Sequence, residues 1–163
     1  RTRRVVLAMG RRGSPRKLGV VGEELSKVVY EIVEMEQFAG RRVLVVGGGD
    51  SAIESAVGLG NQDGTTVQLS YRGESFPRIK PRNQEKLDRA VAAGRITLLL
   101  QTQLREVRAE VAVLEGPAGA MIIPNDDVVI RIGGDAPFAF LEQIGVRIVQ
   151  KDVPIPRDVE KVS

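Results

Sequence analysis

The sequence predicts an α/β fold: a Rossmann-type parallel sheet with helices on both faces and a small antiparallel β-meander that serves as a crossover. Short apolar runs such as 43–46 are typical of strands buried on both faces of a parallel sheet. A strand, a glycine turn, a helix and a second strand follow one another within 42–71, which is the β–α–β unit. Residues 103–123 then change to short β-like runs separated by turns, as in a meander.

The chain before the glycine turn is less regular. Residues 4–9 predict a short buried strand, and the Gly-, Pro- and Arg-rich residues 10–24 predict an extended connection. Val28, Ile32 and Met35 share one face at helical spacing, so we expect a short helix over 28–38 that Gly40 ends.

The central elements have clear start and stop signals. Asp50 or Ser51 is expected to cap a helix over 51–60, and Pro77 and Pro81 introduce a second helix that Gly94 stops. The expected central elements are strand 42–46, helix 51–60, strand 66–71, helix 83–93 and strand 96–100. Beyond them we expect meander runs at 104–107, 111–114 and 121–123, strand 128–132, a helical turn at 138–143 and strand 146–149.

Composition excludes several chemistries. The 163 residues suit one ordinary domain, and the chain contains no Cys and no His. Disulfides, CxxC redox pairs, iron–sulfur ligation, His-based zinc sites and imidazole acid–base catalysis are therefore absent. Composition leaves a carboxylate-ligated Mg²⁺ or Ca²⁺ site open, but no residues are assigned to one. Adjacent Asp126 and Asp127 are interpreted as a turn, since neighbours entering a strand point to opposite faces.

Charge and hydropathy limit the classes of partner that the chain can have. The net charge of +3 is local, because residues 1–20 carry no acidic residue, and aromatic residues make up only 4%. So few aromatics argue against a stacking nucleic-acid surface. No apolar run approaches the ~20 residues that cross a bilayer, and no signal peptide is visible, so we expect a cytoplasmic protein without membrane contact. Since the chain begins at Arg1 on the approach to a strand, we expect it to be part of a longer protein.

The motif Gly47-x-Gly49-x-x-Ala52 carries the first functional prediction. Gly47 allows the tight turn after the strand, Gly49 lets a pyrophosphate approach the backbone, and Ala52 lets the helix pack close to the strand. The helix N-terminus offers N–H groups to the phosphates. A purely structural glycine turn is the alternative. The candidate phosphate-binding residues are Gly47, Gly48, Gly49, Asp50, Ser51 and Ala52.

The end of the second strand indicates which dinucleotide is bound. An acidic residue there favours NAD, whereas Arg suits the 2′-phosphate of NADP. Tyr71 is followed by Arg72, with Arg78 and Lys80 close behind, and Glu74 lies past the strand. We interpret this as NADP selection with Arg72 central and Arg78 and Lys80 assisting. A solvated basic loop is the alternative.

These motifs together resemble a known family. The segments VLVVGGGDSAIE, LSYRGESFPRIK and VVIRIGGDAPFAFLEQIGV occur in the order found in the NADPH-binding domain of thioredoxin-reductase-like flavoproteins, of the pyridine nucleotide-disulfide oxidoreductase superfamily. Ala8-Met9-Gly10 resembles that family's Ala-Thr-Gly segment, with Met for Thr. The family's CxxC would fall within 28–40, which has no Cys, so the chain is most similar to cysteine-free members, which are ferredoxin–NADP reductase-like or bacillithiol-disulfide-reductase-like.

The resemblance implies a domain organisation and a function. Residues 1–24 would connect from an FAD domain that is missing here, 25–150 would bind NADP(H), and 151–163 would be an exit linker. The implied function is presentation of NADPH for hydride transfer to a flavin on another domain, with no catalytic side chain in this chain. The alternative is a non-catalytic nucleotide-binding or interaction module. A short-chain dehydrogenase is disfavoured because neither Tyr30 nor Tyr71 has a Lys four residues on.

The resemblance also adds site residues and partners. Glu54 would sit beside the cofactor, although a surface or helix-dipole role is equally compatible, and Gly133 would lie in the nicotinamide-side loop. The expected partners are NADPH and the FAD domain. The basic opening would steer an acidic electron-transfer partner such as ferredoxin, unless it is only a solvated connection, and a homodimer is left open. The opening's cations are Arg11, Arg12, Arg16 and Lys17.

Overall fold

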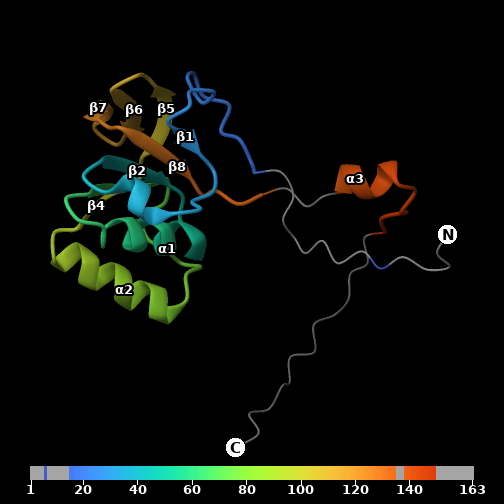
Figure 1. Ribbon diagram of the computed structural model, residues 1–163, viewed down its shortest axis with the longest axis horizontal. Coiled ribbons are helices and arrows are strands. Elements are labelled where there is room, and N and C mark those ends of the chain that lie inside the picture. Colours follow the sequence, from blue (N-terminus) through green and yellow to red (C-terminus); the bar gives the residue numbers. More distant parts are fainter. Residues whose placement is uncertain (1–5, 7–14, 135–137, 150–163) are drawn as a thin grey trace, which may run out of the picture. The chain divides into compact units, whose positions relative to one another are not determined.

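The computed structural model describes residues 6, 15–134 and 138–149. The chain divides into two compact units, one of residues 15–134 and one that combines 1–14 with 135–163. Both sheets and helices α1 and α2 belong to the first unit, and α3 (Phe138–Gln143) belongs to the second (Figure 1). None of the helices in the described ranges has the length and apolar character needed to span a membrane.

A parallel five-stranded sheet forms the centre of the first unit. Its strands lie in the order β1-β8-β2-β3-β4, and every neighbouring pair is parallel. The chain runs from β2 outward to β3 and β4 and then returns to place β8 on the other side of β2. The strand order therefore reverses between β2 and β8, which is the topological switch point where such sheets bind ligands. The strands are β1 (Val28–Val29), β2 (Arg42–Val46), β3 (Thr66–Tyr71), β4 (Ile96–Leu100) and β8 (Asp127–Ile130).

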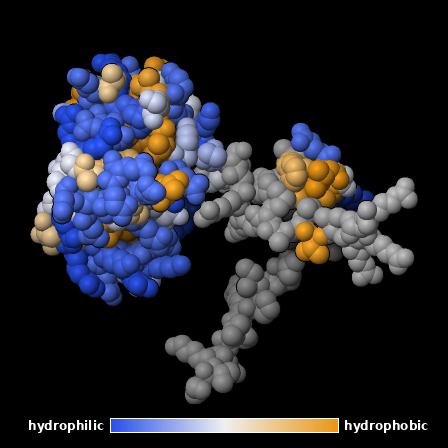
Figure 2. All heavy atoms as spheres, viewed as in Figure 1, coloured by the Kyte–Doolittle hydropathy of each residue, from blue (hydrophilic) through white to orange (hydrophobic). Residues whose placement is uncertain are grey.

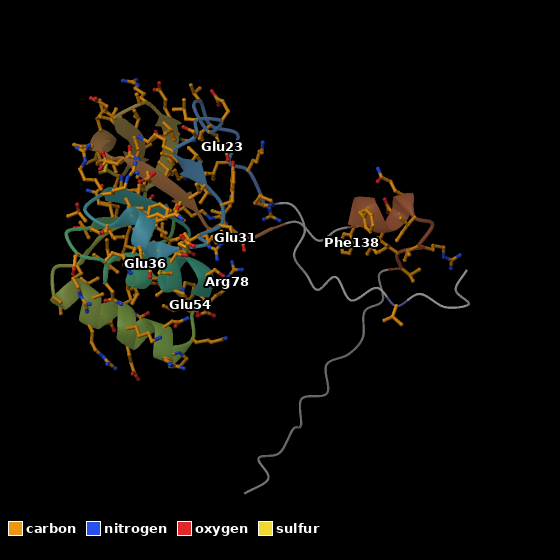
Figure 3. The ribbon with its side chains drawn as sticks, in the orientation of Figure 1. Glu23, Glu31, Glu36, Glu54, Arg78 and Phe138 are labelled. Atoms are coloured by element: carbon orange, nitrogen blue, oxygen red, sulfur yellow. The ribbon has the colours of Figure 1, made fainter. Side chains whose placement is uncertain are left out.

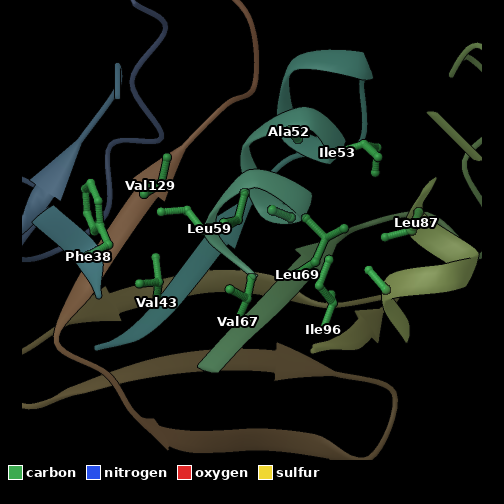
Figure 4. Close-up of a cluster of buried hydrophobic side chains, with 13 residues drawn as sticks. Phe38, Val43, Ala52, Ile53, Leu59, Val67, Leu69, Leu87, Ile96 and Val129 are labelled. Atoms are coloured by element: carbon green, nitrogen blue, oxygen red, sulfur yellow. The ribbon is translucent and has the colours of Figure 1, made fainter. Parts of the chain in front are cut away.

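Helices cover one face of this sheet. α1 (Asp50–Leu59), α2 (Pro81–Ala92) and a 3-10 helix (Met35–Phe38) pack there on Val43 and Val45 of β2 and on the matching residues of its neighbours. Figure 4 shows the resulting cluster. Burial of these aliphatic side chains supplies the main driving force for folding of this layer. The largest labelled members are Phe38, Ile53, Leu59, Leu69, Leu87 and Ile96.

A second, antiparallel sheet covers the opposite face. It consists of β5 (Gln103–Val107), β6 (Val111–Gly116) and β7 (Gly119–Pro124), in that order. Leu44 and Val46 of β2 pack against it, so successive residues of β2 alternate between the two cores. The fold class and the meander are thus confirmed. In the described unit, however, the second face is covered by the meander sheet and not by a helix.

Two further expectations differ from the structure. Residues 28–38 are not one helix: Val28 and Val29 pair with Val128 and Val129 of β8, and only Met35–Phe38 turns helically. Residues 146–149, which were expected to form a strand, have no strand pairing among the described residues. The expected strand at 4–9 and the tail at 151–163 lie outside the described residues, apart from Val6.

The other predicted elements are present with small shifts in their bounds. α2 begins at Pro81, two residues before the expected start, because proline suits the first turn of a helix where its missing N–H is not needed. Strands β2, β3 and β4 have the expected bounds, and the helical turn at 138–143 is α3.

Candidate functional site

The glycine turn lies at the switch point, directly after β2. Gly47 has φ of +149°, and a Cβ atom there would be 2.4 Å from the carbonyl oxygen of Arg131 and 3.0 Å from Cβ of Ala52. Only glycine fits such a position. Ala52 is fully buried, so its small side chain lets α1 pack against the turn. The physical roles expected for Gly47 and Ala52 are those that the structure shows.

The N-terminus of α1 faces this turn. Gly49, and neither Asp50 nor Ser51, is the N-cap, with φ −104° and ψ 175°, so the expected cap residues were wrong. A Cβ atom at Gly49 would meet no protein atom within 4 Å, which leaves space above the turn. The first N–H groups of a helix have no intrahelical acceptor, so the arrangement can bind an anion. Ser51 is exposed in this first turn.

Asp50 and Glu54 join α1 to the start of α2. Asp50 Oδ1 accepts hydrogen bonds from the Lys80 backbone N–H at 2.9 Å and from Asn83 Nδ2 at 2.6 Å. Asn83 Nδ2 also donates to Glu54 Oε1 at 2.9 Å, and Asn83 is only 4% exposed. The bond from the Lys80 N–H, followed by that from Asn83, lowers the pKa of Asp50. Both carboxylates therefore have a structural role, and their contact with a cofactor stays a prediction.

Tyr71 holds the basic loop after β3 against the glycine turn. Its ring stacks on Phe76 with centroids 5.1 Å apart and an interplanar angle of 18°. The same ring fills the space that a side chain at Gly48 or Gly73 would need. A Cβ atom would lie 2.1 Å from the nearest ring atom at Gly48 and 2.7 Å from it at Gly73. Tyr71 therefore contacts the glycine turn through Gly48 and the loop after β3 through Phe76 and Gly73.

The three predicted cations emerge from this loop. Arg72, Arg78 and Lys80 are all exposed. The positive charge of Lys80 contributes to the lowered pKa of Asp50, so its ammonium lies near α1. Arg78 and Glu54 lie at the same edge in Figure 3. The structure therefore places Lys80 near the start of α1, whereas proximity of the exposed Arg72 side chain to the glycine turn stays a prediction.

Gly133 lies at the far side of the switch point, after β8. Its φ is +96°, and a Cβ atom would meet nothing within 4 Å. The carbonyl oxygen of Gly133 accepts a hydrogen bond from the Arg16 N–H at 3.1 Å, and Pro15 pairs antiparallel with Gly134. Residues 15–16 and 133–134 therefore run side by side at the boundary of the first unit.

Asp126 and Asp127 lie at the opposite edge, where β2 and β8 begin. The hydrogen bonds from Arg42 hold the pKa of Asp126 far below its usual range. Asp127 forms an ion pair with Arg41 at 2.6 Å, and burial raises the pKa of Asp127. Each carboxylate is bonded to its own arginine, as expected of structural residues. Within the described ranges, no cluster of three or more acidic residues could hold a metal ion.

Asn83 and Arg131 were not anticipated as site residues. The signal for Asn83 was its place near the start of α2, where a polar residue that becomes buried must bond to a neighbouring helix. The signal for Arg131 was a single charge inside the apolar run 128–132, next to the end of a strand.

Comparisons with known proteins agree with this geometry. The profile of the pyridine nucleotide-disulphide oxidoreductase family matches residues 1–160. The ferredoxin–NADP reductase of Ignicoccus hospitalis is 31% identical over 156 residues, which cover 91% of this chain and 49% of the relative. The bacilliredoxin reductase Bdr of Bacillus subtilis is 31% identical over 145 residues, which cover 88% and 44%.

Solved structures show the same arrangement. The bacillithiol disulfide reductase Bdr of Bacillus cereus superposes with a TM-score of 0.77 at 29% identity, over 85% of this chain and 43% of that one. The thioredoxin reductase of Lactococcus lactis gives 0.69 at 25% identity, over 80% and 45%. The chain thus spans about half the length of the relatives it matches. With the family profile covering nearly every residue, the chain belongs to the pyridine nucleotide-disulphide oxidoreductase family.

Proposed function

We propose that the chain is the NADP(H)-binding domain of an FAD-dependent oxidoreductase, and that it presents NADPH for hydride transfer to a flavin on another domain. The observation that carries this proposal is the open glycine turn at the switch point, against which Tyr71 packs while it stacks on Phe76 of the basic loop after β3. The open space above Gly49, beside the N-terminus of α1, leaves room for an anion at the free N–H groups of the helix.

The residues divide between the two ends of the adenosine half of the cofactor. The backbone of the turn and of the first turn of α1 would hold the pyrophosphate. Arg72 would bind the 2′-phosphate with its planar fork, assisted by Arg78 and Lys80, with Tyr71 as the support of the loop. The residues proposed for the pyrophosphate end are Gly47, Gly48, Gly49, Asp50, Ser51 and Ala52, with Glu54 and Gly133 at its margins.

An FAD domain in the same parent protein is the proposed partner. The relatives are about twice as long as this chain, and the segments 15–16 and 133–134 lie together, as two links to one neighbouring domain would. The apolar residues of the second unit are also strongly exposed, and α3 is largely hydrophobic at its surface in Figure 2. We therefore propose residues 1–24 as the incoming connection, 25–150 as the NADP(H) domain and 151–163 as the outgoing linker.

For the proposed hydride transfer, this chain has only to bind NADPH and orient it. The bound nicotinamide supplies the hydride, and no side chain has to transfer a proton for that step. The chain's residues fix the dinucleotide in an extended pose across the sheet edge. This division of labour fits a sequence without Cys or His.

The sequence left two roles open for the basic opening, a solvated connection and a surface for an acidic electron carrier, and we propose the second. Arg16 and Lys17 are exposed, while Arg11 and Arg12 lie outside the described residues. Exposed cations on a connecting segment can accelerate the encounter with an acidic protein through long-range attraction.

Calorimetry on the whole chain tests the proposal. NADPH should bind more tightly than NADH, because only NADPH has the 2′-phosphate. Arg72→Ala should weaken the binding of NADPH by about 1–3 kcal/mol, the range for charge-assisted hydrogen bonds, and leave the binding of NADH unchanged. Arg105→Ala, which removes an exposed arginine of the meander, is the matched control and should change neither. Equal affinities for the two nucleotides would exclude NADP selection.

A further inference from the structure

Arg131 is placed at the switch point by its backbone. It follows Ile130, the last residue of β8, and its N–H donates to the carbonyl oxygen of Val46 at 2.7 Å. The carbonyl oxygen of Arg131 occupies the space beside Gly47, because a Cβ atom at Gly47 would lie 2.4 Å from this oxygen. The residue therefore borders the glycine turn on the side away from β3.

The side chain of Arg131 reaches from the end of β8 to the end of the neighbouring strand β1. Its Nη1 donates to the carbonyl oxygen of Tyr30, the residue after β1, at 2.8 Å. Its Nε is buried and has no hydrogen-bond partner in the described part of the chain. A buried donor without an acceptor costs about 1–3 kcal/mol, so its retention calls for an explanation.

The strand order decides what this guanidinium faces. Along the sheet edge, β3 and the basic loop lie on one side of β2, and β8 and β1 lie on the other. A dinucleotide whose 2′-phosphate is at β3 and whose pyrophosphate is at the β2 turn must extend its nicotinamide half over β8 and β1. Arg131 lies at this part of the sheet edge, where β8 and β1 end.

We propose that Arg131 binds the nicotinamide mononucleotide half of the cofactor, by donating from its guanidinium to an oxygen of that half. The inference rests on the proposed function. The planar guanidinium has five donors in a fixed fork, and phosphate, ribose and carboxamide oxygens are all acceptors it can use. Arg72 and Arg131 would thus hold opposite ends of one extended ligand.

Calorimetry on the whole chain with two ligands distinguishes contacts to the adenosine end of the cofactor from contacts to its nicotinamide end. Adenosine 2′,5′-bisphosphate carries the adenosine end alone, and NADPH carries both. Arg131→Met should lower the affinity for NADPH about ten- to a hundredfold and leave the affinity for adenosine 2′,5′-bisphosphate within about twofold of the wild-type value. Arg72→Ala should weaken both ligands. Arg95→Met is the matched control, because Arg95 precedes β4 at the opposite edge of the sheet, and it should change neither.

The outcomes are distinguishable. Wild-type chain that binds neither ligand overturns the proposed function itself. Binding that Arg131→Met leaves unchanged, or weakens equally for both ligands, overturns only the role of Arg131, since an equal loss would mark a disturbed fold. Thermal unfolding of Arg131→Met separates such a disturbance from a lost contact. Arg131→Lys, which keeps a cation but loses the fork, should recover only part of the NADPH affinity.

Discussion

At the scale of single residues, two glycines of one turn should lose stability to very different extents when each is changed to alanine. Gly47→Ala forces a side chain into Arg131 at a φ that L-residues rarely adopt, so it should lower the free energy of unfolding by about 2 kcal/mol or more. Gly49→Ala meets open space and should cost less than about 1 kcal/mol, mainly as a poorer N-cap, yet weaken NADPH. Urea denaturation and calorimetry check both, and equal losses of stability would contradict the packing argument.

Residue identity predicted the roles of this turn because those roles are local. Gly47 and Ala52 are five residues apart, and their contact follows from the strand–turn–helix sequence. The bonds of Asp50 and Glu54 to Asn83 could not be predicted, because the partner is about thirty residues away. Arg131 was passed over because the run 128–132 was interpreted as an apolar strand, although its single charge was the informative residue.

At the scale of elements, Glu23 organises the segment that leads into β1. Its carboxylate accepts from the N–H groups of Leu18 and Gly19 at 2.8 and 2.6 Å and from Tyr30 Oη at 2.8 Å. Figure 3 labels Glu23 in this segment. Burial alone would raise the pKa of Glu23, but these hydrogen bonds outweigh it and lower the pKa. Burial and the bond to Glu23 raise the pKa of Tyr30 to about 12.

This arrangement predicts a pH dependence. Because the folded pKa of Glu23 lies below its ordinary value of 4.5, its stabilisation is fully present above that value and is lost as the pH falls toward the folded pKa. Glu23→Gln should lower the unfolding free energy at about pH 7 by about 1–3 kcal/mol and reduce the loss of stability on acidification. Chemical denaturation across the acid range measures both. Glu24→Gln, at the exposed neighbour, should behave as wild type, and an unchanged acid profile for Glu23→Gln would count against the assignment.

The elements that sequence could not predict are those made by distant pairing. β1 has only two residues and exists because Val28 and Val29 find β8 about a hundred residues later, so helical spacing was a misleading local signal. Residues 146–149 have strand-like composition but no described partner, and composition alone does not make a strand. β2, β3 and β4 were predictable because strands buried on both faces are continuously apolar.

At the scale of the whole molecule, exposed apolar surface should control association. Phe138 and Phe140 are 55% and 45% exposed, in a unit where Ile144, Ile148 and Val149 are also accessible. Clustered apolar surface of this kind drives self-association in water. The chain should therefore form concentration-dependent oligomers in sedimentation velocity, and the double change Phe138→Ser and Phe140→Ser should shift it to monomer. Ile122→Ser, at a residue 62% exposed on β7, is the control expected to change nothing. A wild-type chain that stays monomeric at high concentration would contradict this.

The side-by-side course of residues 15–16 and 133–134 has a consequence for protein engineering. Because a β-bridge and a hydrogen bond hold the two ends of the first unit together, residues 17–132 between them form a closed loop. Such a cassette needs only a narrow insertion point in a host chain, since the host backbone is interrupted across about one strand spacing. Grafting 15–134 between two adjacent strands of an unrelated scaffold would then transplant the proposed NADP(H) site without re-routing the recipient's fold.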